Sequence, residues 1–161
     1  MIREVKRNDI PECVQLIRNS FITVANEFGF TVENAPAFTA FAITEEKLFH
    51  QFDEEKRPMY AYYSESNEII GYYSLKLFDN NTCELNNLCV IPQHRHSNIG
   101  KNLLNDAFEK IRKFGCKKVY ISIVEENRIL RKWYEGFGFV HIYTKKFDFF
   151  PFTCGYMEKD L

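Results

Sequence analysis

Short apolar strands alternate with amphipathic helices along this chain, and that alternation restricts the possible folds more than any other feature of the sequence. Apolar residues with a two-residue period predict strands, and apolar residues with a helical period predict helices. From the first residue to the last they give the order β-α-α-β-β-β-α-β-α-β-β. Elements mixed in this way predict an α/β fold, in which helices pack on the faces of a sheet.

The predicted elements have clear limits at most points. Strands are expected at residues 2–6, 59–63, 68–78, 82–91 and 119–123, and two further strands are expected, one before and one after Pro151. Helices are expected at residues 10–24, 44–55, 99–113 and 127–135. Thr44, followed by Glu45 and Glu46, is a typical helix start, because a hydroxyl caps free N–H groups and early acids suit the positive helix end. Asp9, with Glu12 three positions later, predicts a similar cap for the first helix.

One domain is expected to include residues 1–161, because a chain of 161 residues usually folds around one core. Hydrophobic residues make up 45% and charged residues 27%, which is typical of a globular protein. The net charge of −1 offers no basic surface to nucleic acid or a membrane. Five scattered cysteines and a start without the apolar stretch of a secretion signal predict a cytoplasmic protein.

Residues 88–104 combine an apolar strand end, a polar loop and the start of an amphipathic helix. The first turn of a helix has N–H groups without partners and a partial positive charge, so it suits a phosphate group. Arg95 and Lys101 add positive charge there, and Gly100 has no Cβ to keep a ligand away from the backbone. The segment therefore predicts an anion-binding site.

Two familiar nucleotide-binding patterns do not fit this segment. A Walker A loop needs G-x-x-x-x-G-K-[ST], but Asn102 follows Gly100 and Lys101, and Arg95 stands at the earlier glycine position. A dinucleotide-binding fingerprint needs three glycines at set spacing, and this loop has one.

The segment resembles the coenzyme A-binding motif of the GNAT superfamily of acetyl-CoA-dependent N-acetyltransferases. In that family a strand ending in V-x-P leads into [QR]-x-x-G-x-[GA] at the start of a helix, and residues 90–92 and 95–100 follow this pattern. Asn98 replaces the usual glycine, and asparagine is among the few other residues that tolerate left-handed backbone angles. The resemblance implies a mixed, mostly antiparallel sheet flanked by helices. It also implies coenzyme contacts from Leu88, Cys89, Val90, Arg95, His96, Ser97, Asn98, Ile99, Gly100 and Lys101.

Residues 127–139 resemble a second motif of the same family, N-x-x-A-x-x-[LF]-Y-x-x-x-G-F, with Leu130 in place of the small residue. The resemblance implies that Asn127 and Tyr134 contact the coenzyme. It further implies that the Tyr134 hydroxyl lies beside the coenzyme sulfur and protonates the departing thiolate as a general acid. Holding the coenzyme without donating a proton is the alternative role for Tyr134.

In GNAT enzymes a neutral amine attacks the acetyl thioester directly, which requires a base and a donor for the developing oxyanion. Glu84, eleven positions before Arg95, resembles in its placement the amine-activating glutamate of histone-type relatives. An exposed strand glutamate without a catalytic role, or a water chain in its place, is the alternative. The oxyanion donor implied is a backbone N–H between Leu88 and Val90.

Other chemistries find weaker support among the residues. A covalent role for Cys89 would need an activating base or a positive environment, so an inert strand cysteine is favoured. His94 and His96 lack the further ligands of a metal site, and no metal is expected. His50 and His141 are isolated in the sequence and indicate no function.

The acceptor is expected to be an amine of an unidentified small molecule or peptide. Residues 27–43 and 147–152 are rich in phenylalanine and correspond to acceptor walls in the family, so an amine with some apolar character would fit; core packing explains the same residues equally well.

A non-catalytic acetyl-CoA-binding module is the alternative function. A third possible function is a domain that recognises a protein partner or binds nucleic acid, and the net charge disfavours nucleic-acid binding. Both a monomer and a homodimer remain open.

Overall fold

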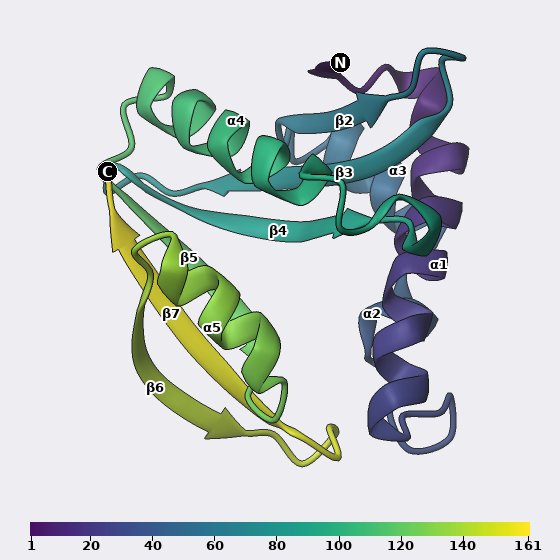
Figure 1. Ribbon diagram of the computed structural model, residues 1–161, viewed down its shortest axis with the longest axis vertical. Helices are drawn as coiled ribbons and strands as arrows, with labels where there is room; N and C mark the ends of the chain where they lie inside the picture. Colours follow the sequence, from purple (N-terminus) through teal and green to yellow (C-terminus); the bar gives the residue numbers. More distant parts are fainter.

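The computed structural model describes residues 1–161 and contains one sheet of seven strands in the order β1-β2-β3-β4-β5-β7-β6. Neighbouring strands are antiparallel except β4 and β5, which are parallel (Figure 1). The strands are β1 (Ile2–Glu4), β2 (Met59–Tyr63), β3 (Ile69–Leu77), β4 (Thr82–Val90), β5 (Lys118–Val124), β6 (Val140–Lys146) and β7 (Thr153–Asp160). The predicted mixed, mostly antiparallel sheet is confirmed.

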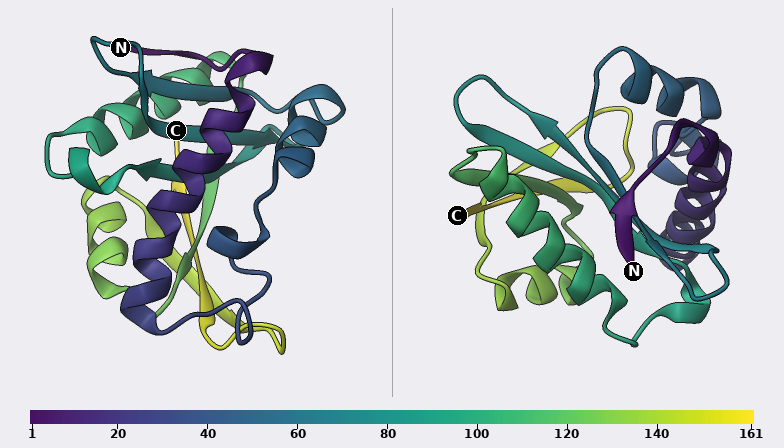
Figure 2. Two further views of the ribbon diagram at one scale, coloured as in Figure 1. Left: turned by 90° about the vertical axis from the view of Figure 1, so that its right-hand side faces the viewer. Right: turned by 90° about the horizontal axis from the view of Figure 1, so that it is seen from above.

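Helices cover both faces of the sheet, and Figure 2 shows α1 and α4 on opposite sides of it. The helices are α1 (Ile10–Phe28), α2 (Thr39–Ala42), α3 (Glu45–Asp53), α4 (Ile99–Lys113) and α5 (Arg128–Gly136), with short 3-10 helices η1 (Arg7–Asp9) and η2 (Pro92–His94). None of them has both the length and the apolar character that a membrane-spanning helix needs.

Alternate residues of the central strands supply two cores, one on each face. Tyr72 packs with side chains of α1 and α3, whereas the next residue, Tyr73, packs with side chains of α4. We call these sides of the sheet the α1 face and the α4 face. A Cβ added to Gly71 would lie 2.7 Å from Leu103 Cδ1, so the glycine lets α4 pack directly on β3.

Most predicted elements are confirmed, and the structure adds one helix. The limits of β2 agree with the prediction, and those of the other strands and long helices differ by a few residues at most. The segment at residues 27–43, predicted as irregular, contains α2. This helix has four residues, which is too short to produce a recognisable helical period.

One of the two predicted helix caps is confirmed. Thr44 accepts a hydrogen bond from the Lys47 N–H at 3.1 Å and caps α3. The Asp9 cap is wrong, because Asp9 makes no side-chain cap hydrogen bond to α1. The Asp9 carboxylate instead accepts from the Tyr63 hydroxyl at 2.8 Å.

Glu12 also has a different partner from the predicted one. Its carboxylate accepts a hydrogen bond from the Ile69 N–H at 3.0 Å. Glu12 therefore connects the first turn of α1 to β3, far away in the sequence, and no local pattern could reveal that contact.

β4 and β5 pair only at their first three positions and then diverge, as Figure 1 shows. The last of these pairs joins Glu84 to Tyr120. Beyond it β4 continues beside β3, and β5 continues beside β7. The β3–β4 pairing is irregular near Asn87, which has a φ of 55°, and irregularities of this kind bend a strand. The rest of β4 therefore has one edge without a strand partner.

Candidate active site

The loop between β4 and α4 presents a row of backbone N–H groups. None of the N–H groups of residues 96–101 donates to an acceptor in the protein. His96 and Asn98 adopt left-handed φ angles of 64° and 65°, so the left-handed conformation considered for Asn98 is observed, and that of His96 was not foreseen. We call residues 96–101 the N–H row. Because it includes the positive end of α4, it has the features of an anion-binding site.

The two cations predicted beside the N–H row differ in their surroundings. Lys101 is exposed and makes no ion pair, so its charge is available to a ligand. The Arg95 guanidinium is directed into the protein, where Nε donates to the Val90 carbonyl oxygen at 3.0 Å. Its Nη1 and Nη2 donate to the Thr23 hydroxyl at 3.0 Å and to the Ser20 carbonyl oxygen at 2.9 Å.

Trp133 packs against the start of α4. A Cβ added to Gly100 would lie 3.7 Å from Trp133 Cζ2 and 3.8 Å from Val90 Cγ2. The Trp133 ring centroid also lies 5.0 Å from that of Tyr134. The end of β4, the first turn of α4 and helix α5 therefore meet around Gly100.

Tyr134 is buried in the core on the α4 face, with 6% of its surface exposed. Its ring lies edge-on to Phe139, with centroids 5.3 Å apart. Burial, and to a smaller extent the nearby Cys89 thiol, holds the pKa of the Tyr134 hydroxyl far above the usual range for a phenol. Tyr134 therefore keeps its proton at neutral pH and is a potential proton donor.

Glu84 lies at the closed end of the gap between β4 and β5. It is half-buried, forms no ion pair, and faces Lys76 across the β3–β4 pair. Cys89 lies five positions after Glu84 on β4, a distance of at most roughly 17 Å along the strand. Glu84 lies on the α1 face and Tyr134 belongs to the α4 face, so the two predicted catalytic groups approach the gap from opposite sides.

Cys89 is in an environment that does not activate a thiol. Burial raises the pKa of the Cys89 thiol to about 12. A contact with Ser20 and the positive charge of Arg95 lower this pKa, but by less than burial raises it. Cys89 is therefore a neutral thiol at physiological pH, which agrees with the inert role favoured from the sequence. No group of three or more His, Cys, Asp or Glu side chains is arranged as a metal site.

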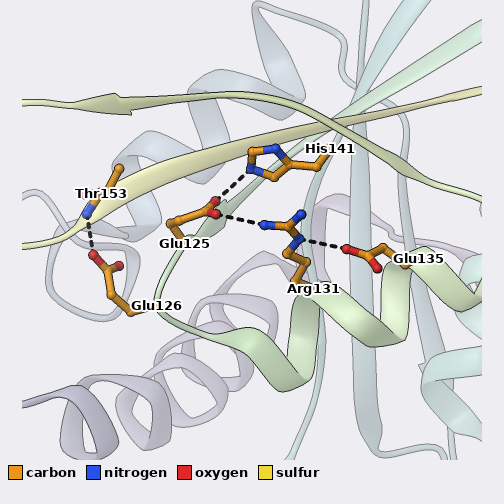
Figure 3. A network of polar contacts seen from close by, with 6 residues as sticks. All are labelled: Glu125, Glu126, Arg131, Glu135, His141 and Thr153. Carbon is orange, nitrogen blue, oxygen red and sulfur yellow. Dashed lines mark hydrogen bonds and ion pairs between the residues drawn. The ribbon is translucent and has the colours of Figure 1, made fainter.

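Two sets of contacts hold α5, which carries Tyr134. Asn127 is the N-cap of the helix, and its side chain accepts from the Leu130 N–H at 3.2 Å. Glu125 lies between His141 and Arg131 in Figure 3: its Oε2 is 2.9 Å from His141 Nε2, and its Oε1 accepts from Arg131 Nη1 at 3.0 Å.

Sequence reasoning missed the contribution of Glu125 and treated His141 as isolated. The two residues are sixteen positions apart and meet because β6 returns beside β7, so spacing along the chain could not indicate the pair. Arg131 extends the network to Glu135, with Nε donating to Oε1 at 2.7 Å, also drawn in Figure 3. These contacts fasten α5 to the neighbouring strands.

The two phenylalanine-rich segments meet in space. Phe152 lies 4.7 Å from Phe30 and 5.8 Å from Phe38 between ring centroids. These three rings are buried and form, with neighbouring residues, a small core that we call the aromatic cluster. Core packing therefore explains the buried members. Phe149, with 55% of its surface exposed, remains available on the outside.

Comparison with known proteins identifies the family. The sequence profile of the acetyltransferase (GNAT) family matches residues 26–139. The uncharacterized N-acetyltransferase YjgM of Escherichia coli is 24% identical over 147 residues, which cover 88% of this chain and 83% of that protein. The chloroplastic GCN5-related N-acetyltransferase 6 of Arabidopsis thaliana is 34% identical over 62 residues, 38% of this chain and only 22% of that relative.

A solved structure of similar fold covers the whole chain. The PaiA N-acetyltransferase of Thermoplasma acidophilum, solved in complex with coenzyme A, superimposes with a TM-score of 0.85 at 21% sequence identity, over 100% of this chain and 98% of that one. Together with the profile match, the seven-stranded mixed sheet shows that this chain belongs to the GNAT acetyltransferase family. It is an acyltransferase of that family, as the sequence predicted.

Proposed function

We propose that the protein transfers an acetyl group from acetyl-CoA to the primary amine of a small molecule or a peptide, in a ternary complex without an acetylated enzyme. The observation that carries the proposal is the row of six unpaired N–H groups at the start of α4, beside the open edge of β4. A diphosphate fits such a row, since each oxygen needs donors and the helix end supplies positive potential.

The coenzyme contacts follow from this placement. The N–H groups of His96, Ser97, Asn98, Ile99 and Gly100, with the charge of Lys101, would hold the pyrophosphate. The open edge of β4 at residues 88–90 would hydrogen-bond the pantetheine arm and supply the N–H for the oxyanion. Asn127, at the start of α5, faces the same gap in this proposal. The PaiA relative, solved with coenzyme A, supports the use of this cosubstrate.

The direction of approach differs for the two substrates. The N–H row and Tyr134 both belong to elements that cover the α4 face, so the coenzyme would enter from that side. On the α1 face, the ends of β5 and β7 pack with residues of α1 and α2 through Val124 and Cys154, whereas α5 packs on the α4 face. The acceptor amine would therefore reach the thioester from the α1 face.

The proposed chemistry needs two proton transfers. When bound, acetyl-CoA supplies the acetyl thioester. Glu84 takes the amine proton, directly or through water, as the nitrogen bonds to the acetyl carbon. Tyr134 gives its proton to the sulfur as the carbon–sulfur bond breaks. Since burial keeps the Tyr134 hydroxyl neutral, the donor is in its protonated form before each turnover.

The acceptor in this proposal is an amine with an apolar part. The exposed ring of Phe149 and the stacked pair Tyr143 and Tyr156, 4.6 Å apart, lie on or next to the α1 face of the C-terminal strands. Aromatic surfaces of this kind bind both apolar groups and ammonium cations. Five free cysteines and no disulfide support the proposed cytoplasmic location.

A titration with acetyl-CoA tests the coenzyme site without knowledge of the acceptor. Trp133, the single tryptophan, borders Gly100, so its fluorescence should change on binding, and calorimetry gives the stoichiometry. ATP serves as a control, because it carries phosphates without the pantetheine arm. Binding of acetyl-CoA and not of ATP is expected, and no binding of either would contradict the proposal.

A panel of amines, followed by the release of free thiol, then tests catalysis. Release that depends on both acetyl-CoA and one class of amine is the expected result. Tight coenzyme binding with no release for any amine would leave the non-catalytic binding module as the function.

A further inference from the structure

Arg95 and two residues of α1 form a closed group of hydrogen bonds. The Arg95 guanidinium donates through Nη1 to the Thr23 hydroxyl at 3.0 Å and through Nη2 to the Ser20 carbonyl oxygen at 2.9 Å. The Thr23 hydroxyl in turn donates to the same Ser20 carbonyl at 2.8 Å. The third nitrogen, Nε, donates to the Val90 carbonyl oxygen. Every nitrogen of the guanidinium thus has an acceptor within the protein.

The loop that follows Arg95 needs support from outside itself. His96 and Asn98 both hold left-handed φ angles, which residues other than glycine adopt at an energetic cost and keep only where the surroundings enforce them. Within the loop, the one side-chain hydrogen bond is from the Ser97 hydroxyl to the His94 carbonyl. The contacts of Arg95 with α1 and with the end of β4 are the connection that fixes where the loop begins.

We propose that Arg95 is a positioning residue, which ties the N–H row to α1 through Thr23, and that it does not bind the coenzyme phosphates itself. The proposal rests on the proposed coenzyme site. The planar guanidinium suits this task, because it can donate in fixed directions to the strand end and the helix at once. Lys101, exposed and unpaired, is then the cation left for the ligand.

The connection also joins the two sides of the proposed site. Thr23 lies in the C-terminal half of α1, two positions before Ala25, which belongs to the aromatic cluster. The start of the N–H row and the helix that leads into the phenylalanine-rich segment are therefore held by the same group of hydrogen bonds.

Tryptic cleavage tests the tie in the protein without coenzyme. Trypsin must take the arginine side chain into its pocket, so the bond after Arg95 should resist cleavage while the guanidinium is held. Thr23→Val removes the acceptor without changing the side-chain shape, and it should speed the appearance of the fragment ending at Arg95 several-fold. Thr144→Val, the same change on the exposed strand β6, is the control and should cleave like the unmodified protein.

Coenzyme titrations on the same variants, followed by Trp133 fluorescence, give the second readout. Thr23→Val should raise the Kd for coenzyme A about 3- to 10-fold, less than the full value of one hydrogen bond to a charged group, because Thr23 acts on the ligand only through Arg95. Thr23→Ser, which keeps the hydroxyl, should restore the Kd to within about twofold of the unmodified protein. Arg95→Lys should lose about as much affinity as Arg95→Gln, since geometry and not charge is needed. Adding Thr23→Val to Arg95→Gln should cost nothing more.

The outcomes separate the two proposals. Unchanged cleavage and unchanged coenzyme affinity in Thr23→Val would overturn the positioning role, as would an Arg95→Lys variant that binds normally, because a direct phosphate contact keeps its charge in lysine. Failure of the unmodified protein to bind coenzyme A would overturn the proposed function alone, and the cleavage comparison would still decide whether Arg95 is held by Thr23.

Discussion

Gly100 stands in the first turn of α4, where its missing side chain serves the ligand and not the fold. A Cβ there would meet Trp133 and Val90 at ordinary contact distances, so alanine fits the protein. Since alanine is favoured over glycine in helices by up to about 1 kcal/mol, Gly100→Ala should raise the melting temperature. The added methyl would lie over the N–H row, and the Kd for coenzyme A should rise about tenfold or more.

Thermal melts and fluorescence titrations of the same preparation check the Gly100 prediction. An alanine variant that binds coenzyme A as tightly as the unmodified protein would show that the ligand does not approach this part of the backbone.

Tyr134→Phe should separate proton donation from packing. Phenylalanine fills the same buried space beside Phe139, so the fold and the KM for acetyl-CoA should be preserved, while kcat falls by up to about 10²- to 10⁴-fold. Tyr62→Phe, at a half-buried tyrosine of β2 away from the gap, is the matched control. Equal turnover of both variants would leave Tyr134 with the alternative role of holding the coenzyme.

Single residues show where sequence reasoning succeeds and where it stops. The Thr44 cap and the left-handed Asn98 could be predicted, because both are local consequences of side-chain chemistry. The partners of Glu12, Arg95 and His141 could not. Each of these polar side chains bonds to an element remote in the sequence, so only the folded arrangement determines whether it serves a ligand or the fold.

At the scale of the element, the attachment of α5 depends on a glycine in a neighbouring strand. A Cβ on Gly155 would overlap the Glu125 carboxylate, which His141 and Arg131 hold in place. Gly155→Ala should therefore displace Glu125 and lower the free energy of unfolding by about 1–3 kcal/mol. Because α5 carries Tyr134, kcat should fall as well. Urea unfolding and steady-state kinetics measure the two effects.

A double variant tests the cause of the Gly155 effect. Glu125→Ala removes the carboxylate that the new methyl would strike, so Glu125→Ala with Gly155→Ala should be no less stable than Glu125→Ala alone. Strictly additive losses would mean that the Gly155 position acts through another contact, such as the nearby Ile123 side chain.

Most elements were predictable because their apolar period reflects burial on one face. The helix at residues 99–113 is the clearest case, since Leu103, Leu104, Ala107 and Ile111 are all fully buried. The divergence of β4 and β5 was not derivable from periodicity. It depends on an irregular pairing with β3 and on which neighbour each strand follows, and these are properties of the whole sheet.

At the scale of the whole molecule, buried thiols should make the fold sensitive to alkali. Burial raises the pKa of Cys83 to about 12 and, with the nearby Asp9 and Glu12 charges, holds that of Cys13 higher still. A raised pKa means that the folded state binds more protons than the unfolded chain. Stability is therefore complete below the thiol pKa of the unfolded chain, near pH 8.5–9, and is lost as the pH rises from there toward 12.

The expected loss is about 1.4 kcal/mol per pH unit for each such thiol, and the tyrosines buried in both cores should add to it above about pH 10. Urea midpoints measured between pH 7.5 and 10.5 under reducing conditions give the slope. Cys83→Ala should be less stable at pH 7.5 because it leaves a cavity, yet its stability should decline less steeply with pH, since one titrating group is gone. A constant urea midpoint up to pH 10.5, or the same slope in Cys83→Ala, would mean that these thiols ionise equally in the folded and unfolded states and that their burial is not what limits the fold at high pH.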